Sequence, residues 1–173
     1  SIRSYVSTTY GLMFLIVVPL GIIISLVVPY INWSSLLSVN EQYNDTIVKA
    51  TQILVVFFAL QMIVNVVTPV VAAYQKVALS SLFGVVGQFI SLVIIFILTK
   101  TVPSSLIVLC IVFAGAPVVT MLFSSFIMYS GKLHPVRPSV HSVDFSLVKD
   151  LWTLGWKFFV IQIQLVLVYQ MTN

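Results

Sequence analysis

Long stretches without a charged residue divide this chain. The five uncharged runs contain 37, 26, 23, 31 and 16 residues, at positions 4–40, 50–75, 77–99, 101–131 and 158–173. The hydrocarbon core of a membrane is about 30 Å thick, and about 20 apolar residues of helix are needed to cross it. The first four runs are long enough, so the sequence predicts four complete membrane spans and the start of a fifth.

Apolar residues within these runs are continuous and do not alternate with polar ones. Residues 12–18, 53–58 and 92–98 are nearly solid apolar segments, whereas a membrane barrel alternates in segments of about ten residues. Backbone groups in lipid must also satisfy their hydrogen bonds within the segment, which favours helices. We therefore predict an all-α integral membrane protein. Its helices are expected near residues 10–31, 50–74, 78–98 and 105–129, with an incomplete one from 155 to 173.

The composition supports this class and narrows the possible partners. Hydrophobic residues make up 60% of the chain and charged residues 7%, against about 45–50% and about 25% in soluble domains, which excludes a soluble globule. The net charge of +4 is scattered, and no stretch interleaves basic with aromatic residues, so no nucleic-acid partner is predicted. The single Cys110 excludes an internal disulfide and any cysteine-based metal cluster.

The connections between the predicted helices differ in length. A turn around Gln75 and Lys76 and a short turn containing Pro103 join the second, third and fourth helices, so we expect these three helices to lie antiparallel as neighbours. The longest connection follows Gly131 and contains prolines. Asp144 is suited to cap a short amphipathic helix at the membrane surface, either as a linker between two helix bundles or as an ordinary loop with one interfacial turn.

These connections divide the chain into three expected parts. Residues 1–131 form the later part of one transmembrane lobe, residues 132–154 a cytoplasmic linker, and residues 155–173 the first helix of a second lobe. The chain opens on Ser1, with no initiator Met, and stops inside an apolar run. We therefore expect it to be a fragment of a longer protein.

The basic residues predict an orientation, because Lys and Arg accumulate in cytoplasmic loops. Placing the N-terminus inside leaves only Lys49 and Lys100 on the outer side. The six cytoplasmic residues are then Arg3, Lys76, Lys132, Arg137, Lys149 and Lys157. The first, third and fifth helices run outward in this orientation.

No pattern in the chain is typical of an enzyme. It has no Gly-rich phosphate loop, no zinc-protease motif and no nucleophile elbow, and its complete spans hold no carboxylate. His134 and His141 lie in a proline-interrupted loop that gives no fixed ligand geometry, so we predict no metal site and no cofactor.

Neutral amides are the notable polar groups inside the spans. Gln61 and Asn65 are four residues apart and share one helix face, Gln88 lies in the third helix and Gln162 in the fifth. Amides in hydrocarbon must find partners or water. They either join helices by hydrogen bonds or line a polar pathway for a substrate. Lys157 either reaches the cytoplasmic surface or projects into the same pathway.

Three prolines interrupt predicted helices. Pro19, Pro69 and Pro117 each remove a backbone hydrogen bond and clash with the preceding turn. Bent helices suit a protein that opens alternately to two sides, although transmembrane helices also tolerate static kinks.

Several segments resemble the bacterial polysaccharide (O-antigen) flippases of the Wzx type, within the multidrug/oligosaccharidyl-lipid/polysaccharide exporter superfamily. The likeness runs through nearly all the chain. It is carried by Pro19-Leu20-Gly21, Ile31-Asn32-Trp33-Ser34, the block Asn65 to Gln88 with Ala73-Tyr74-Gln75-Lys76, Ala114-Gly115-Ala116-Pro117, and Gly155 to Ile163.

This resemblance implies a two-lobed transporter of twelve or so helices in the bacterial cytoplasmic (inner) membrane. Such a protein flips a lipid-linked oligosaccharide of the polyprenyl-pyrophosphate type to the outer leaflet by alternating access. The four complete helices here would be the third to sixth of the family and the fifth would be the seventh. Lys157 is the residue that would stand in for the positive groups that family members place in their cavity. A drug or cation antiporter of the same superfamily and a membrane enzyme of lipid-linked sugar metabolism remain alternatives.

Overall fold

The computed structural model describes residues 1–101, 105–131 and 133–172 of the chain. Within these residues the chain is helical and contains no strand. Five of its helices are long and apolar enough to cross a membrane. The prediction of an all-α, multi-pass membrane protein is thereby confirmed at that level. The predicted turn at Pro103 and the basic residue Lys132 lie outside the described residues.

Long α-helices are joined by short helical turns, in which η denotes a 3-10 helix. In chain order they are α1 (Ile2–Val27), η1 (Val28–Tyr30), α2 (Trp33–Leu37), η2 (Glu41–Tyr43), α3 (Asn44–Val64), α4 (Val67–Ala73), α5 (Val77–Thr101), α6 (Leu106–Ser130), η3 (His134–Val136), η4 (Val140–Ser142), η5 (Phe145–Leu147) and α7 (Val148–Thr172).

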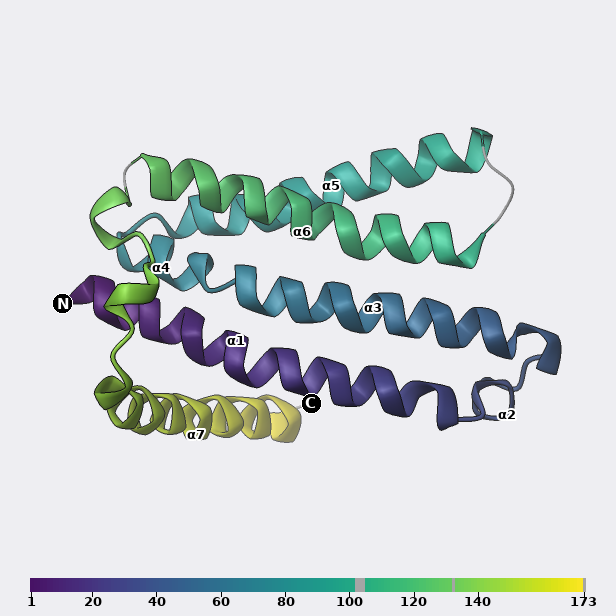
Figure 1. Cartoon of the computed structure of the whole chain (residues 1–173), viewed down its shortest axis with the longest axis horizontal. Coiled ribbons are helices and arrows are strands. Elements are labelled where there is room, and N and C mark those ends of the chain that lie inside the picture. Colours follow the sequence, from purple (N-terminus) through teal and green to yellow (C-terminus); the bar gives the residue numbers. More distant parts are fainter. Residues whose placement is uncertain (102–104, 132, 173) are drawn as a thin grey trace.

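Helices α1, α3, α5 and α6 lie side by side (Figure 1), and α1 and α5 run in one direction while α3 and α6 run in the other. α1 packs against α3, α3 against α6, and α6 against α5. α6 therefore lies between α3 and α5, whereas the sequence predicted the second, third and fourth spans to be antiparallel neighbours. The contact between the second and third spans is kept by the short α4, which packs against α5.

The second predicted span, residues 50–74, is broken into α3 and α4. Pro69 has no amide hydrogen to donate to the carbonyl of Asn65, and its ring would clash with that carbonyl in a continuous helix. The Asn65 carbonyl instead accepts from the amide of Thr68 at 3.0 Å. The helix consequently ends at Val64 and restarts at Val67, so Pro69 lies in the first turn of α4.

The predicted turn around Gln75 and Lys76 is confirmed. α4 ends at Ala73, and Gln75 has a φ of 61°, in the left-handed region. The amide of Gln75 donates to the Ala72 carbonyl at 2.8 Å, and the amide of Lys76 donates to the Val71 carbonyl at 3.3 Å. These bonds satisfy carbonyls that the helix end would otherwise leave open.

Two predicted helix starts are wrong. α1 begins at Ile2 and not near residue 10, because Ser1 caps it by accepting from the amide of Ser4 at 3.4 Å. The fifth helix begins at Val148 and not at Gly155, so the expected short linker helix and the expected span form one helix, α7. A single glycine costs a helix interior only about 1 kcal/mol, and no proline follows to stop it. α7 is therefore long enough to span a membrane.

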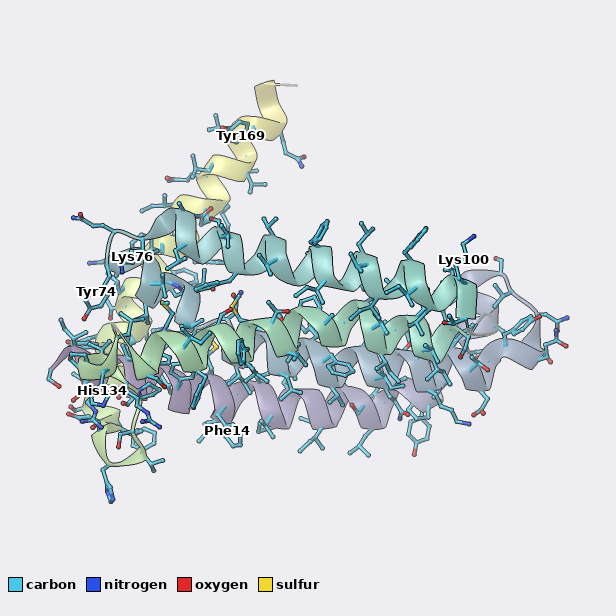
Figure 2. All side chains as sticks on the ribbon, turned by 90° about the horizontal axis from the view of Figure 1, so that it is seen from above. Phe14, Tyr74, Lys76, Lys100, His134 and Tyr169 are labelled. Atoms are coloured by element: carbon cyan, nitrogen blue, oxygen red, sulfur yellow. The ribbon has the colours of Figure 1, made fainter. Side chains whose placement is uncertain are left out.

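α7 stands apart from the other long helices. Its main contacts are with η5, which directly precedes it, and its residues up to Gln170 are partly or fully exposed. Figure 2 shows α7, in pale yellow with Tyr169 near its end, rising away from the four packed helices.

A cluster of buried apolar side chains lies at one end of the bundle, which we call the packed end. They come from the end of α3, from α4, from the end of α6 and from the segment that follows it. The cluster consists of Val64, Val67, Val71, Met121, Tyr129, Leu133 and Val136. Val67 and Val71 are 0% and 1% exposed, so this end behaves as the core of the bundle.

The connection between α6 and α7 is attached to the first turns of α1 at the packed end. The buried hydroxyl of Thr8 donates to the carbonyl of Asp144 at 3.3 Å and accepts from its amide at 3.0 Å. The buried hydroxyl of Ser7 accepts from the amide of Ser139 at 3.0 Å. Hydrogen bonds of this kind order a backbone that has no partner of its own in a helix or sheet.

Asp144 also begins the helical segment that leads into α7, as predicted. Its carboxylate accepts from the Ser146 amide at 2.9 Å and from the Ser146 hydroxyl at 2.6 Å. Both bonds stabilise the charged carboxylate and so hold the pKa of the Asp144 carboxyl below its usual range. The bond from the Ser146 hydroxyl has the larger effect, and the bond from the Ser146 amide adds to it.

Candidate functional site

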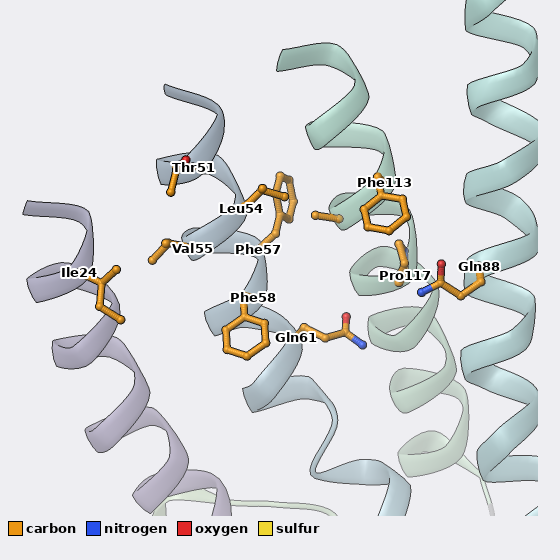
Figure 3. A pocket seen from close by; sticks show the side chains of 11 residues that line it. Ile24, Thr51, Leu54, Val55, Phe57, Phe58, Gln61, Gln88, Phe113 and Pro117 are labelled. Atoms are coloured by element: carbon orange, nitrogen blue, oxygen red, sulfur yellow. The ribbon is translucent and has the colours of Figure 1, made fainter. Parts of the chain in front are cut away.

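A groove of about 490 Å³ opens in the middle of the bundle, away from the packed end. It lies between α1, α3, α5 and α6 (Figure 3). Its walls are mostly apolar and aromatic, and they include two glutamines. The lining residues are Ile24, Thr51, Leu54, Val55, Phe57, Phe58, Gln61, Gln88, Phe113, Ala114 and Pro117.

Close contacts beside the groove fix the spacing of the helices that line it. A Cβ atom on Gly87 of α5 would lie 3.0 Å from the Cα atom of Pro117 on α6. A Cβ atom on Gly115 would lie 3.2 Å from the ring of Phe57 on α3. Because Gly87 has no side chain, α5 comes into contact with the backbone of α6 at Pro117. Because Gly115 has none, the Phe57 ring of α3 packs directly against the backbone of α6. At Gly84, one turn earlier on α5, a Cβ atom would meet nothing within 4 Å.

The two glutamines point toward each other across α6 (Figure 3). The side-chain oxygen Oε1 of Gln61 is buried and has no hydrogen-bond partner among the described residues. Gln88 is exposed and borders the same space. An amide oxygen shielded from water without a partner is uncommon in folded proteins and calls for an explanation.

Pro117 adds another polar group to this region. Its ring nitrogen carries no hydrogen, so the carbonyl of Phe113, four residues earlier, does not receive the helical bond that residue 117 would otherwise donate. Phe113 and Pro117 both line the groove. Two neighbouring carbonyls of α6 accept hydrogen bonds from side-chain hydroxyls. The Ala116 carbonyl accepts from the Thr120 hydroxyl at 2.8 Å, and the Val112 carbonyl accepts from the Ser91 hydroxyl at 3.3 Å.

Of the five residues predicted to line a substrate path, the structure brings Gln61 and Gln88 together. Asn65 lies at the break between α3 and α4, where its exposed side chain accepts from the Thr68 hydroxyl at 2.8 Å. Lys157 and Gln162 are exposed on α7 and do not border the groove. The groove in this structure is thus built by α1, α3, α5 and α6 alone.

The prolines named from the sequence have different settings. Pro19 and Pro117 lie inside α1 and α6, which continue past them. Pro69 follows the break between α3 and α4. Two of the four helices that line the groove therefore contain a proline, and a third, α3, ends at the break.

The aromatic side chains of the groove were not identified from the sequence. Phe57, Phe58 and Phe113 look like lipid-facing residues, because a phenylalanine on a membrane helix carries no sign of what it contacts. A weak signal exists in the spacing: Phe57 is four residues before Gln61, and Phe113 is four residues before Pro117. Residues four apart share one helix face, so Phe57 lies on the same face as the polar Gln61, and Phe113 on the same face as Pro117.

The side chains that line the groove are uncharged. Lys76 and Lys100 mark opposite ends of the bundle in Figure 2. In the part of the chain that the structure describes, no group of three or more His, Cys, Asp or Glu side chains is placed to hold a metal ion.

In comparisons with protein-family models, curated proteins and solved structures, nothing matches this chain. The chemistry of the groove is therefore the starting point for a function.

Proposed function

We propose that this chain forms part of a membrane transporter that moves a lipid-linked oligosaccharide across the cytoplasmic membrane by alternating access. The observation that carries the proposal is the groove inside a bundle of membrane-length helices, with aromatic walls and two facing amides. A substrate that joins a hydrocarbon chain to a polar group needs such a mixed surface, since ligand sites combine apolar walls with a few placed polar groups.

The interruptions of the lining helices support a moving bundle. Pro19 in α1, Pro117 in α6 and the break before Pro69 leave points at which the two halves of a helix can change their angle. Transport by alternating access needs such points around the substrate. The packed end provides the fixed part against which the rest of the bundle moves.

The resemblance to polysaccharide flippases gives the proposal its direction and location. It implies a bacterial inner membrane, transport from the cytoplasmic to the outer leaflet, and a second lobe that completes the cavity. The proposed orientation places the packed end, with Arg3, Lys76 and Arg137 near it, on the cytoplasmic side. The acidic Glu41 and Asp45 and the basic Lys100 then lie outside.

The test is complementation with the full-length protein in a strain from which the gene is deleted. Transport by the groove predicts that the double substitution Gln61→Leu and Gln88→Leu removes surface polysaccharide and causes lipid-linked precursor to accumulate at the inner leaflet. Gln170→Leu, which changes an exposed amide on α7, is the matched control and should support normal export.

Two results would replace the proposal with another function. Unchanged surface polysaccharide in the deletion strain, together with drug export that depends on a proton or sodium gradient, would indicate an antiporter. Precursor that crosses the membrane normally but is not joined into polymer would indicate an enzyme of lipid-linked sugar metabolism.

A further inference from the structure

Gln61 and Gln88 line one groove together with Phe113, whose carbonyl Pro117 leaves without its usual helical hydrogen bond. We infer that these three groups form a binding site for the uncharged hydroxyl groups of a membrane-anchored substrate, and that the phosphate of the substrate is held elsewhere. This inference rests on the proposed function and specifies which portion of the substrate the groove recognises.

The hydrogen-bonding capacity of the three groups matches hydroxyls. Each glutamine amide offers a carbonyl oxygen that accepts and an NH₂ group that donates. The carbonyl of Phe113, freed by Pro117, accepts only. A hydroxyl both donates and accepts, so a pair of neighbouring hydroxyls can bond to the amides and to the carbonyl together.

The residues that line the groove do not supply the positive charge that a phosphate site needs. A phosphate moved out of water needs a cation or several donors, because an unpaired charge in a low-dielectric environment is strongly unfavourable. The lining residues include no Lys or Arg, and the labelled lysines Lys76 and Lys100 lie at the ends of the bundle (Figure 2). A neutral polar group fits this setting.

The apolar part of the groove suits the chain that carries such a group. Phe57, Phe58 and Leu54 line the groove beside Gln61. The amides occupy a small share of the wall, so they select the orientation of a bound molecule while the aromatic side chains provide most of the contact area. The ligand class is therefore an amphiphile with a hydroxyl-bearing, uncharged head.

The unpartnered oxygen of Gln61 is the second, independent observation. Its Oε1 is buried and bonds to nothing among the described residues, so in this structure it adds no link between helices. A leucine of similar size would avoid the unfavourable burial. A glutamine is therefore explained at this position by a partner that is absent from the protein itself.

The test uses the full-length protein in phosphatidylcholine nanodiscs and a dodecyl maltoside probe that carries a photoreactive diazirine in its alkyl chain. The measured quantity is the probe concentration that gives half-maximal labelling of peptides from α3 and α6. Gln61→Leu and Gln88→Leu should each raise this concentration about threefold to tenfold, the range expected for one neutral hydrogen bond. Gln170→Leu should not change it.

Competition separates the head from the chain. Unlabelled dodecyl maltoside should prevent labelling, whereas dodecylphosphocholine, which has the same alkyl chain and a phosphate head, should not. Equal protection by both detergents would overturn the inference, as would labelling that is unchanged in both single variants. Because Gln88 is exposed, we expect Gln88→Leu to fold even if Gln61→Leu does not. The labelling of Gln88→Leu alone then still tests the inference.

The outcomes for this site and for the proposed function are distinguishable. Labelling that depends on the amides, combined with normal polysaccharide export by the double variant, supports the hydroxyl site and overturns the proposed function. Loss of export without any change in labelling supports the proposed function and overturns the hydroxyl site.

Discussion

The packed end and the groove use similar polar residues in opposite ways. At the packed end, the hydroxyls of Thr8 and Ser7 bond to the backbone of the connection between α6 and α7. The hydroxyls of Tyr10 and Tyr129 lie 3.3 Å apart, with their rings edge to face. In the groove, the buried oxygen of Gln61 has no partner among the described residues.

This difference separates two roles for polar groups inside one membrane protein. A polar group that bonds within the fold contributes to stability, because leaving its partner unpaired is unfavourable. A polar group that faces a groove without a partner adds no such stability, and it is free to bind a ligand. The comparison therefore predicts a graded set of effects on the free energy of unfolding, largest at close contacts and smallest at the glutamines.

The largest effect is expected where the groove adjoins the contact between α5 and α6. Gly87→Leu places a side chain where a Cβ atom alone would be 3.0 Å from the backbone of Pro117. Backbone cannot move aside as a flexible side chain can, so we expect a loss of about 3 kcal/mol in the free energy of unfolding. Reversible unfolding in mixed micelles measures it.

Gly84→Leu is the matched control on the same helix, because a Cβ at that position meets nothing within 4 Å. It should leave the free energy of unfolding unchanged or raise it by up to about 1 kcal/mol, because leucine forms helix better than glycine. Equal losses in the two variants would mean that α5 and α6 do not approach each other at Gly87, and the groove would lose its boundary on that side.

The next effect tests the attachment of the α6–α7 connection to α1. Thr8→Val keeps the shape of the side chain but removes the hydroxyl that bonds twice to the backbone of Asp144. The amide of Asp144 loses its partner, so we expect a loss of about 1–3 kcal/mol and faster proteolysis of residues 133–147. Thermal unfolding and limited proteolysis measure the two changes.

Thr9→Val is the control for that substitution. The hydroxyl of Thr9 bonds to the Tyr5 carbonyl within α1, at 2.9 Å, so its removal should leave the connection in place. If both variants are cleaved at the same rate, the connection is held by other contacts and the packed end is less rigid than the comparison assumes.

A smaller effect is expected for the tyrosine pair. Tyr129→Phe retains the ring that packs edge to face on Tyr10, with centroids 6.3 Å apart, and removes only the hydrogen bond. We expect a loss of about 0.5–1.5 kcal/mol. A double-mutant cycle with Tyr10→Phe isolates the coupling between the two hydroxyls, and additive effects of the two substitutions would show that they do not interact.

The sequence predicted the helices better than it predicted their packing. Uncharged runs located the spans because a charged side chain in the hydrocarbon core is strongly unfavourable, so spans are depleted of charge. The break at Asn65 was displaced from the expected kink at Pro69, since a proline disturbs the turn that precedes it. The continuity of α7 through Gly155 was missed because a glycine weakens a helix without ending it.

The candidate site was predictable only in its polar members. Gln61 and Gln88 are conspicuous in apolar runs, whereas Lys157 and Gln162 are equally conspicuous and lie on a helix that stands apart. Which amides meet depends on the order of the helices in space. That α6 lies between α3 and α5 follows from contacts such as Gly87 with Pro117, which no periodicity in a single helix reveals.

The smallest effect on stability is expected at the glutamine that the groove leaves unpaired. Gln61→Leu removes a buried oxygen that has no partner among the described residues, so the free energy of unfolding should stay the same or rise by about 1 kcal/mol. The proposed function predicts that polysaccharide export nevertheless falls. A loss of stability comparable to that of Thr8→Val would show that Gln61 bonds within the fold, and the distinction between the packed end and the groove would then fail at its central residue.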